Sequence, residues 1–152
     1  MKLLIVRHAD SISSPTIDEK ILSEKGIQET VKIAKHLQKI AYKSDNIWHS
    51  TKLRAKQTAS IIAEHIDSTD KLVQKPNLAP LDDPRDIITE IENIDENVIV
   101  VSHLPFIQKM LSYLFINTDL LSIFDFKSSS VICLEKHESE WVIEWALSAE
   151  IV

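Results

Sequence analysis

Residues 97–106 read NVIVVSHLPF and join the strongest strand signal of the chain to the start of a helix. The run 98–101 is apolar and β-branched without interruption, which is typical of a strand buried on both faces of a parallel sheet. Pro105 suits the first turn of a following helix, because that turn leaves its N–H groups unpaired in any case. This stretch predicts a strand, a polar turn and a helix, which together are the repeating unit of an α/β protein.

The same unit recurs on both sides of this stretch. Strand-like apolar runs predict further strands at residues 2–6, 46–49, 71–75, 130–135 and 141–147, the last two joined by a polar turn at 136–140. Apolar residues at helical spacing predict helices at 23–41, 52–66, 83–94 and 105–114, and the apolar face of the first begins at Ile27. We expect a three-layer α/β/α sandwich with a mostly parallel central sheet and an antiparallel C-terminal strand pair.

The composition excludes several classes of function. The chain has 152 residues, so we expect one domain that spans 1–152. Its only glycine, Gly26, excludes Gly-rich phosphate loops such as the P-loop and the dinucleotide-binding fingerprint. A formal net charge of −6 without a basic block argues against a nucleic-acid partner.

Location and assembly are predicted from what the sequence lacks. No apolar stretch reaches the roughly 18 residues of a membrane-spanning helix, and the apolar run before Arg7 is too short for a signal peptide. Because Cys133 is the only cysteine, we expect no internal disulfide and a cytoplasmic protein without a membrane partner. We also expect a monomer, since no exposed apolar face stands out.

Three predicted strands lead directly to polar residues. The first ends in Arg7-His8, the second is followed by Arg54, and the NVIVV strand ends next to His103. Ligands of open α/β sheets bind at the carboxyl ends of the strands, so these side chains should converge. Arginine presents paired N–H groups to phosphoryl oxygens, and an imidazole nitrogen can attack phosphorus. Together the four residues predict a phosphoryl site.

Each candidate also has a structural interpretation, which the sequence leaves open. Arg54 fits a solvated helix residue and His103 fits a helix cap. The remaining histidines fit solvated or packed positions, and none has the spacing and flanking ligands of a metal site, so we expect no metal. Trp141 and Trp145 have even spacing, so we expect them on one face of a strand as core or edge packing.

The chain resembles the histidine phosphatase superfamily in three motifs: RHAD at 7–10, STKLRAKQT at 50–58 and VVSHLPF at 100–106. Within that superfamily they are most similar to the small SixA-type phosphohistidine phosphatases, and LSEKG at 22–26 and Pro80…Asp83-Pro84 also fit. The resemblance implies a phosphoglycerate mutase-like fold without metal or organic cofactor. It implies His8 as nucleophile and Arg7, Arg54 and His103 as the phosphate pocket.

The chain departs from the family pattern at two places. Ala9 replaces the glycine of R-H-G, which is tolerable if position 9 is extended or helical. The glutamate that larger members use as general acid has no counterpart in LAPL at 78–81; Asp82 and Asp83 are the nearest carboxylates, and Asp83 is predicted to cap a helix. An alkoxide leaving group, whose conjugate acid has a pKa of about 15.7, needs a proton donor. Imidazole, with a pKa of about 6.5, does not.

The leading hypothesis is therefore an enzyme that removes phosphate from a histidine-phosphorylated protein through a phospho-His8 intermediate. The family suggests a phosphocarrier domain of a phosphorelay as the substrate. One alternative is a small-molecule phosphomonoesterase with Asp82 as the acid. Another is a non-catalytic module that binds phosphorylated proteins.

Overall fold

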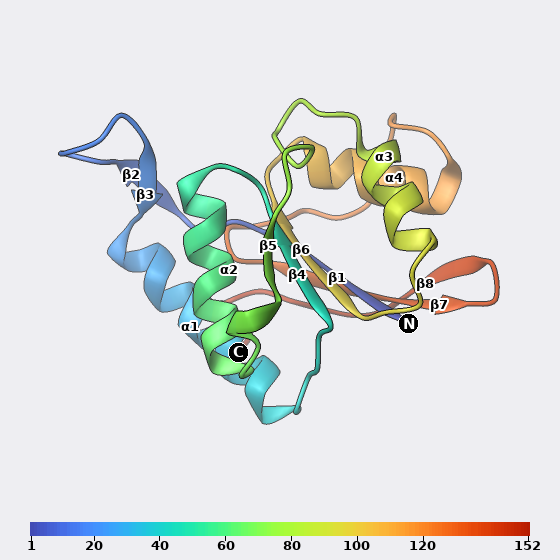
Figure 1. Cartoon of the computed structure of the whole chain (residues 1–152), viewed down its shortest axis with the longest axis horizontal. Helices are drawn as coiled ribbons and strands as arrows, with labels where there is room; N and C mark the ends of the chain where they lie inside the picture. The colour runs from blue at the N-terminus through green and yellow to red at the C-terminus, as the bar shows by residue number, and fades with distance from the viewer.

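A computed structural model describes residues 1–152, and its centre is a six-stranded sheet with the order β5-β4-β6-β1-β7-β8 (Figure 1). The strands are β1 (Lys2–Arg7), β4 (Asn46–His49), β5 (Leu72–Gln74), β6 (Val98–Ser102), β7 (Val131–His137) and β8 (Glu140–Leu147). Strands β5, β4, β6 and β1 run parallel, whereas β7 is antiparallel to both β1 and β8. The predicted mostly parallel sheet with an antiparallel C-terminal pair is confirmed.

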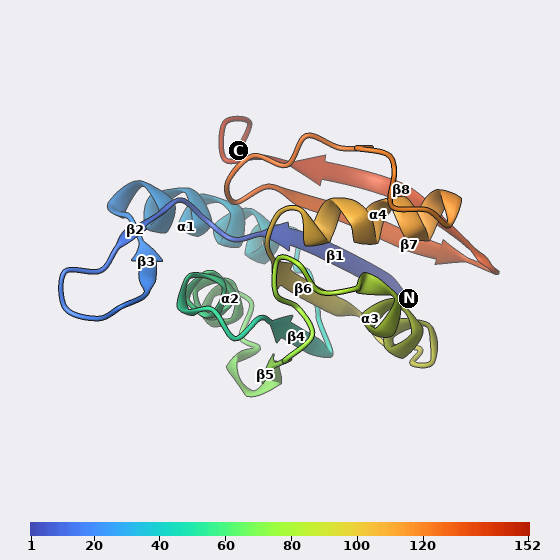
Figure 2. The same cartoon turned by 90° about the horizontal axis from the view of Figure 1, so that it is seen from above.

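Four helices cover the two faces of this sheet (Figure 2). One face packs on α1 (Glu24–Lys39) and α2 (Leu53–His65), and the other on α3 (Pro84–Glu92) and α4 (Phe106–Ile116). Because side chains alternate along a strand, Leu4 and Val6 of β1 lie in the first core and Leu3 and Ile5 in the second. The α/β/α sandwich is thus built by strands that are apolar on both faces. None of the helices is both long and apolar enough to cross a membrane.

A short hairpin outside the main sheet was not predicted from the sequence. It consists of β2 (Ser11–Ser13) and β3 (Lys20–Leu22), which form a two-stranded sheet of their own and extend away from the main sheet (Figure 1). Two contacts tie it to α2: the Leu22 N–H donates to Gln57 Oε1 at 2.9 Å, and the Leu53 N–H donates to Glu19 Oε2 at 3.1 Å. A single turn of 3-10 helix, η1 (Thr69–Lys71), precedes β5.

The start of α1 explains the one glycine of the chain. Ser23 caps the helix by accepting the Gly26 N–H at 3.0 Å. A Cβ on Gly26 would lie 2.2 Å from the carbonyl oxygen of Asp10. Glycine is therefore required here because the loop after β1 passes in contact with the first turn of α1.

Two sequence predictions for packing are wrong. Ile27, expected on the buried face of α1, is 45% exposed beside a groove between α1 and α2. Trp141 and Trp145 do not share a face, because Trp141 packs with α3 and α4 whereas Trp145 packs against the core under α1 and α2. The reason is a β-bulge: Cys133 pairs with Trp145, but the next residue, Leu134, pairs with Ile143.

The turn between the last two strands is also shorter than expected. Strand β7 continues to His137 and β8 begins at Glu140, so the turn is confined to Glu138 and Ser139 instead of 136–140. Glu138 has a φ of 55°, the left-handed conformation typical of such tight connections.

Candidate active site

The carboxyl edge of the sheet brings three of the four predicted site residues together. His8 follows β1, Arg54 lies in the first turn of α2 after β4, and His103 follows β6. The rings of His8 and His103 have centroids 4.9 Å apart, and Arg54 Nε donates to His8 Nε2 at 3.2 Å. The backbone N–H of His8 donates to Ser102 O at 2.9 Å, so the loop after β1 is fixed to the end of β6.

Two hydrogen bonds identify the tautomer of His8. Nδ1 lies 2.8 Å from the Ala9 carbonyl, and because a carbonyl oxygen only accepts, Nδ1 must carry the proton. Nε2 lies 3.2 Å from Arg54 Nε, which only donates, so Nε2 must carry a lone pair. The geometry therefore requires a neutral imidazole whose nucleophilic atom is Nε2.

Electrostatics keep both rings neutral at physiological pH. Burial lowers the pKa of His8 to about 4; repulsion from Arg54, Arg7 and Lys20 adds to this, and the hydrogen bond to the Ala9 carbonyl opposes it. Burial also lowers the pKa of His103 to about 3, with repulsion from His8 and Arg54 adding to the effect. A neutral imidazole is the form that can attack phosphorus.

Ser50 contacts a predicted site residue, although no role in the site was predicted for it from the sequence. Its Oγ lies 2.5 Å from His103 Nε2, and it also accepts the Lys52 N–H at 3.2 Å. Both Ser50 and His103 are buried, and His103 Nδ1 has no hydrogen-bond partner. Ser50 thus orients the His103 ring. The position of Ser50 directly after the predicted strand 46–49 and shortly before Arg54 was the one signal in the sequence that could have indicated this role.

Arg7 stands apart from the other three residues. Its Nη1 donates to the Phe126 carbonyl at 2.8 Å, its Nε is buried without a partner, and no hydrogen bond joins it to His8, Arg54 or His103. Its influence on the site is electrostatic, because it contributes to the lowered pKa of His8.

The two departures from the family pattern have structural explanations. Ala9 is fully buried, its φ is not positive, and its N–H donates to Thr58 Oγ1 at 3.1 Å. The backbone of Ala9 therefore does not need glycine. Asp82 Oδ2 accepts the Ala79 N–H at 2.7 Å, and Asp83 caps α3 as predicted by accepting the Arg85 N–H at 3.0 Å. Both carboxylates therefore hold local backbone.

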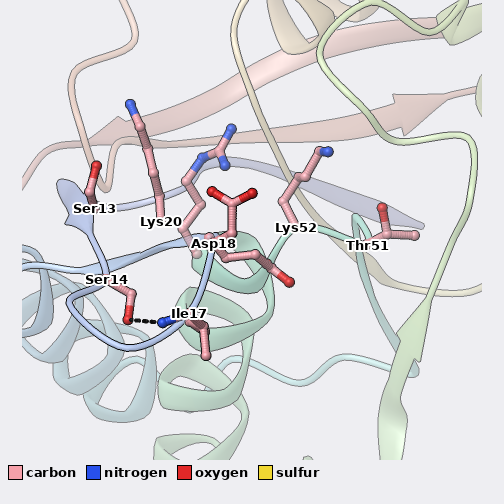
Figure 3. Close-up of a pocket in the computed structure, with 9 residues that line it drawn as sticks. Ser13, Ser14, Ile17, Asp18, Lys20, Thr51 and Lys52 are labelled. Carbon is pink, nitrogen blue, oxygen red and sulfur yellow. Dashed lines mark hydrogen bonds between the residues drawn. The ribbon is translucent and has the colours of Figure 1, made fainter.

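A large open hollow adjoins Arg54 (Figure 3). Its volume is about 570 Å³, and the hairpin and the start of α2 line it with Ser13, Ser14, Ile17, Asp18, Glu19, Lys20, Thr51, Lys52 and Arg54. Figure 3 shows the side chain of Lys20 from the hairpin and that of Lys52, the residue before α2, on either side of it. No group of three or more histidine, cysteine or carboxylate side chains lies close enough to hold a metal ion.

Comparisons with known proteins identify the family of the chain and structures with a similar fold. Residues 3–82 match the family model of the histidine phosphatase superfamily, branch 1. The solved structure of the protein histidine phosphatase SixA complexed with tungstate is 22% identical, covers 99% of both chains and superposes with a TM-score of 0.86. A phosphoserine phosphatase from Entamoeba histolytica is 16% identical over 97% of this chain and 96% of its own, with a TM-score of 0.75.

A phosphoglycerate mutase from Bacillus anthracis is 16% identical over 95% of this chain and 91% of its own, with a TM-score of 0.72. At these identities the solved structures establish the phosphoglycerate mutase-like fold. No curated protein matches the sequence.

Proposed function

We propose that this chain, which belongs to the histidine phosphatase superfamily, removes phosphate from a histidine-phosphorylated protein through a phospho-His8 intermediate. The observation that carries the proposal is the fixed lone pair of His8 Nε2, held on a neutral ring beside Arg54 and His103. A nucleophile, a guanidinium and a second imidazole within one cluster are the groups that phosphoryl transfer to histidine requires.

In the first step, His8 Nε2 attacks phosphorus, and the P–N bond to the substrate imidazole breaks. The substrate ring leaves as neutral histidine because its other nitrogen keeps a proton. Positive charge develops on the His8 ring as the new bond forms, and the Ala9 carbonyl, 2.8 Å from Nδ1, stabilises that charge. Arg54 moves from Nε2 to the phosphoryl oxygens, which neutralises their charge and frees the lone pair.

In the second step, water attacks phosphorus and the P–Nε2 bond breaks. The proton lost by the water passes to the phosphate product or to solvent, and His8 regains its neutral form. His103, neutral and held at Nε2 by Ser50, donates a hydrogen bond from Nδ1, which has no partner within the protein, to a phosphoryl oxygen in both steps. Arg7 supplies further positive charge.

The substrate class follows from the leaving group. Imidazole needs no strong acid to leave, whereas a sugar or serine alkoxide does. The carboxylate of Asp82 is bound to the Ala79 N–H and supports the turn 79–82, and that of Glu19 is bound to the Leu53 N–H. The engagement of these two carboxylates favours a P–N over a P–O substrate; Asp18 is the one carboxylate lining the hollow that makes no hydrogen bond, and it is the remaining candidate for an acid. We further propose that the substrate is a phosphocarrier domain of a cytoplasmic phosphorelay.

Turnover of a histidine-phosphorylated protein, compared with a panel of sugar and nucleotide phosphates, tests the proposal. We expect rapid release of phosphate from the P–N substrate and slow release from every ester. Rapid ester hydrolysis that Asp82→Asn abolishes would instead establish a phosphomonoesterase. Binding of the phosphoprotein without any turnover would establish a non-catalytic module.

A further inference from the structure

An apolar groove lies beside the polar hollow of the candidate site. Its volume is about 390 Å³, and its walls come from β3, α1 and α2, with lining residues Leu22, Ile27, Leu53, Lys56, Gln57, Ser60 and Ile61. Two elements connect it with the site: Leu53 of the groove precedes Arg54 in α2, and Leu22 ends the strand that begins with Lys20 of the hollow. The groove and the hollow therefore lie next to each other along α2 and β3.

The groove and the neighbouring hairpin expose three isoleucine side chains. Ile27 is 45% exposed in the groove, and Ile12 and Ile17 of the neighbouring hairpin are 52% and 48% exposed. Exposed apolar residues that gather beside a site, with polar residues at the rim, are typical of a protein-binding surface. Ile27, which the helical spacing placed in the core, thus lines this groove at the surface.

The groove and the hollow carry three unpaired lysines next to the carboxylates of Asp18 and Glu19. Lys20, Lys52 and Lys56 are exposed and take part in no salt bridge, although the chain has a formal net charge of −6. Lys52 and Lys56 are one helical turn apart, where like charges repel, and they stand at the N-terminus of α2, where cations are unfavourable. Carboxylates of a partner would relieve this unfavourable arrangement.

We propose that the groove docks the protein that carries the phosphohistidine, through a helix with an apolar ridge and flanking acidic residues. Two walls of the groove are helices whose backbone groups are already bonded, and in the third wall, β3, the Leu22 N–H is bonded to Gln57, so an amphipathic helix suits the groove better than an extended strand. The apolar ridge would fill the groove, while the acidic residues would meet Lys52 and Lys56. This inference rests on the proposed function, because it places the phosphohistidine of that helix over His8.

Two substrates with the same P–N bond test the docking surface: free phosphohistidine, and an acidic helical protein phosphorylated on histidine with phosphoramidate. We expect Ile27→Glu and Lys56→Glu each to raise KM for the phosphoprotein by about tenfold or more. Turnover of free phosphohistidine should stay within about twofold of the parent protein, since neither residue touches the reacting atoms. If Ile27→Glu folds poorly, Lys56→Glu alone still tests the docking surface, because Lys56 is exposed.

Ile40→Glu is the matched control, because Ile40 ends the same helix and is 46% exposed, almost the same as Ile27 at 45%. This variant should change neither the KM for the phosphoprotein nor the KM for free phosphohistidine. Unchanged phosphoprotein KM in both groove variants, or equal loss on both substrates, would overturn the docking site. So would a dimer that Ile27→Glu dissociates, because a second copy would then occupy the groove. If the parent protein hydrolyses neither substrate and forms no phosphoenzyme, the proposed function itself fails.

Discussion

The N-terminus of α2 and the N-terminus of α3 are built in opposite ways. Helix α3 follows the usual rules: Asp83 accepts the Arg85 N–H, Pro84 takes the first position and Asp86 places a carboxylate in the first turn. Helix α2 has Lys52 as its N-cap residue, which makes no side-chain capping bond, and its first turn holds no acidic residue; the one side chain that bonds an N–H of this turn is Glu19 of the hairpin, which accepts from Leu53 at 3.1 Å. Arg54 adds a second cation next to the helix dipole, which favours anions at this end.

The other two helices divide in the same way. Helix α1 has Ser23 as its cap and Glu24 in its first turn, whereas α4, which follows His103, has no side-chain cap and no acid. The two helices that directly follow the site strands β4 and β6 are thus the two whose N-cap residue makes no side-chain bond. A helix N-terminus that carries cations attracts a phosphoryl group. We propose that these helix starts are less stable than those of α1 and α3 because they bind an anion, as local rules often fail at functional sites.

Arg54 and Arg85 provide the largest test of this comparison, since each lies in the first turn of its helix. We expect Arg54→Ala to lower kcat/KM on a phosphohistidine substrate about 10²- to 10³-fold, as for loss of one charge-stabilising donor. Its free energy of unfolding should hardly change. Arg85→Ala should leave kcat/KM within about twofold. Equal losses of activity in the two variants, measured by phosphate release, would contradict the proposed difference between the starts of α2 and α3.

Gly26→Ala tests the structural character of the α1 start. A Cβ placed 2.2 Å from Asp10 O forces the loop after β1 and the helix apart, so we expect a loss of about 3 kcal/mol in the free energy of unfolding. Ala41→Gly is the control, because Ala41 has a φ of 53° and glycine should stabilise it by roughly 1 kcal/mol. Urea unfolding measures both. A Gly26→Ala protein as stable as the parent would show that the loop yields freely.

The pH dependence of activity tests how Arg54 affects the pKa of His8. The pKa of His8 is about 4 and that of His103 about 3, so activity should persist to about pH 5 and fall as His8 is protonated near pH 4. Removal of its positive neighbour should raise the pKa of His8 in Arg54→Ala but not in Arg85→Ala, which imidazole NMR titration can measure. A His8 pKa near its usual value of 6.5 in the parent protein would contradict the account.

The sign of the stability effect follows from the same values. Because the pKa of His8 is lower in the folded chain than its ordinary value of 6.5, the unfolded chain binds more protons between about pH 4 and that value. Stability is therefore unaffected by His8 above pH 6.5 and declines as the pH falls toward 4. We expect His8→Asn to reduce this decline in urea unfolding measured across that range.

Substitutions at the N-cap residues of α2 and α3 should have the smallest effects on stability and kinetics. Lys52→Asp supplies α2 with an N-cap and removes a cation, so we expect about 1 kcal/mol more stability and a higher KM for a phosphoprotein. Asp83→Ala should cost about 1 kcal/mol and leave turnover unchanged. Thermal unfolding and steady-state kinetics of both proteins decide this. Lower stability in Lys52→Asp would mean that the lysine stabilises α2 after all.

The sequence predicted those parts of the fold that local patterns determine. Apolar runs identified β1 and β6, and Asp83-Pro84 identified the start of α3. The β2–β3 hairpin escaped because its strands are three residues each and owe their position to contacts with Gln57 and Leu53 of a distant helix. The Trp141–Trp145 error arose from a bulge, which reverses the facing of side chains without any mark in the spacing.

The site was predictable only in part, for a similar reason. Strand ends placed His8, Arg54 and His103 at one edge, and the structure brings these three together. The bond from Ser50 to His103 depends on the register between β4 and β6, which no single stretch specifies. The tautomer of His8 likewise depends on the positions of the Ala9 carbonyl and Arg54.

The central claim is that His8 Nε2 receives the phosphoryl group, and rapid quenching of the enzyme during turnover tests it most directly. Alkaline quenching preserves the acid-labile P–N bond, after which peptide mass spectrometry locates the phosphoryl group and ³¹P NMR identifies the ring nitrogen. We predict phosphate on His8 at Nε2, because Nδ1 is protonated against the Ala9 carbonyl. Phosphate on another residue or on Nδ1, or a phosphorylated His8→Ala protein, would contradict the account.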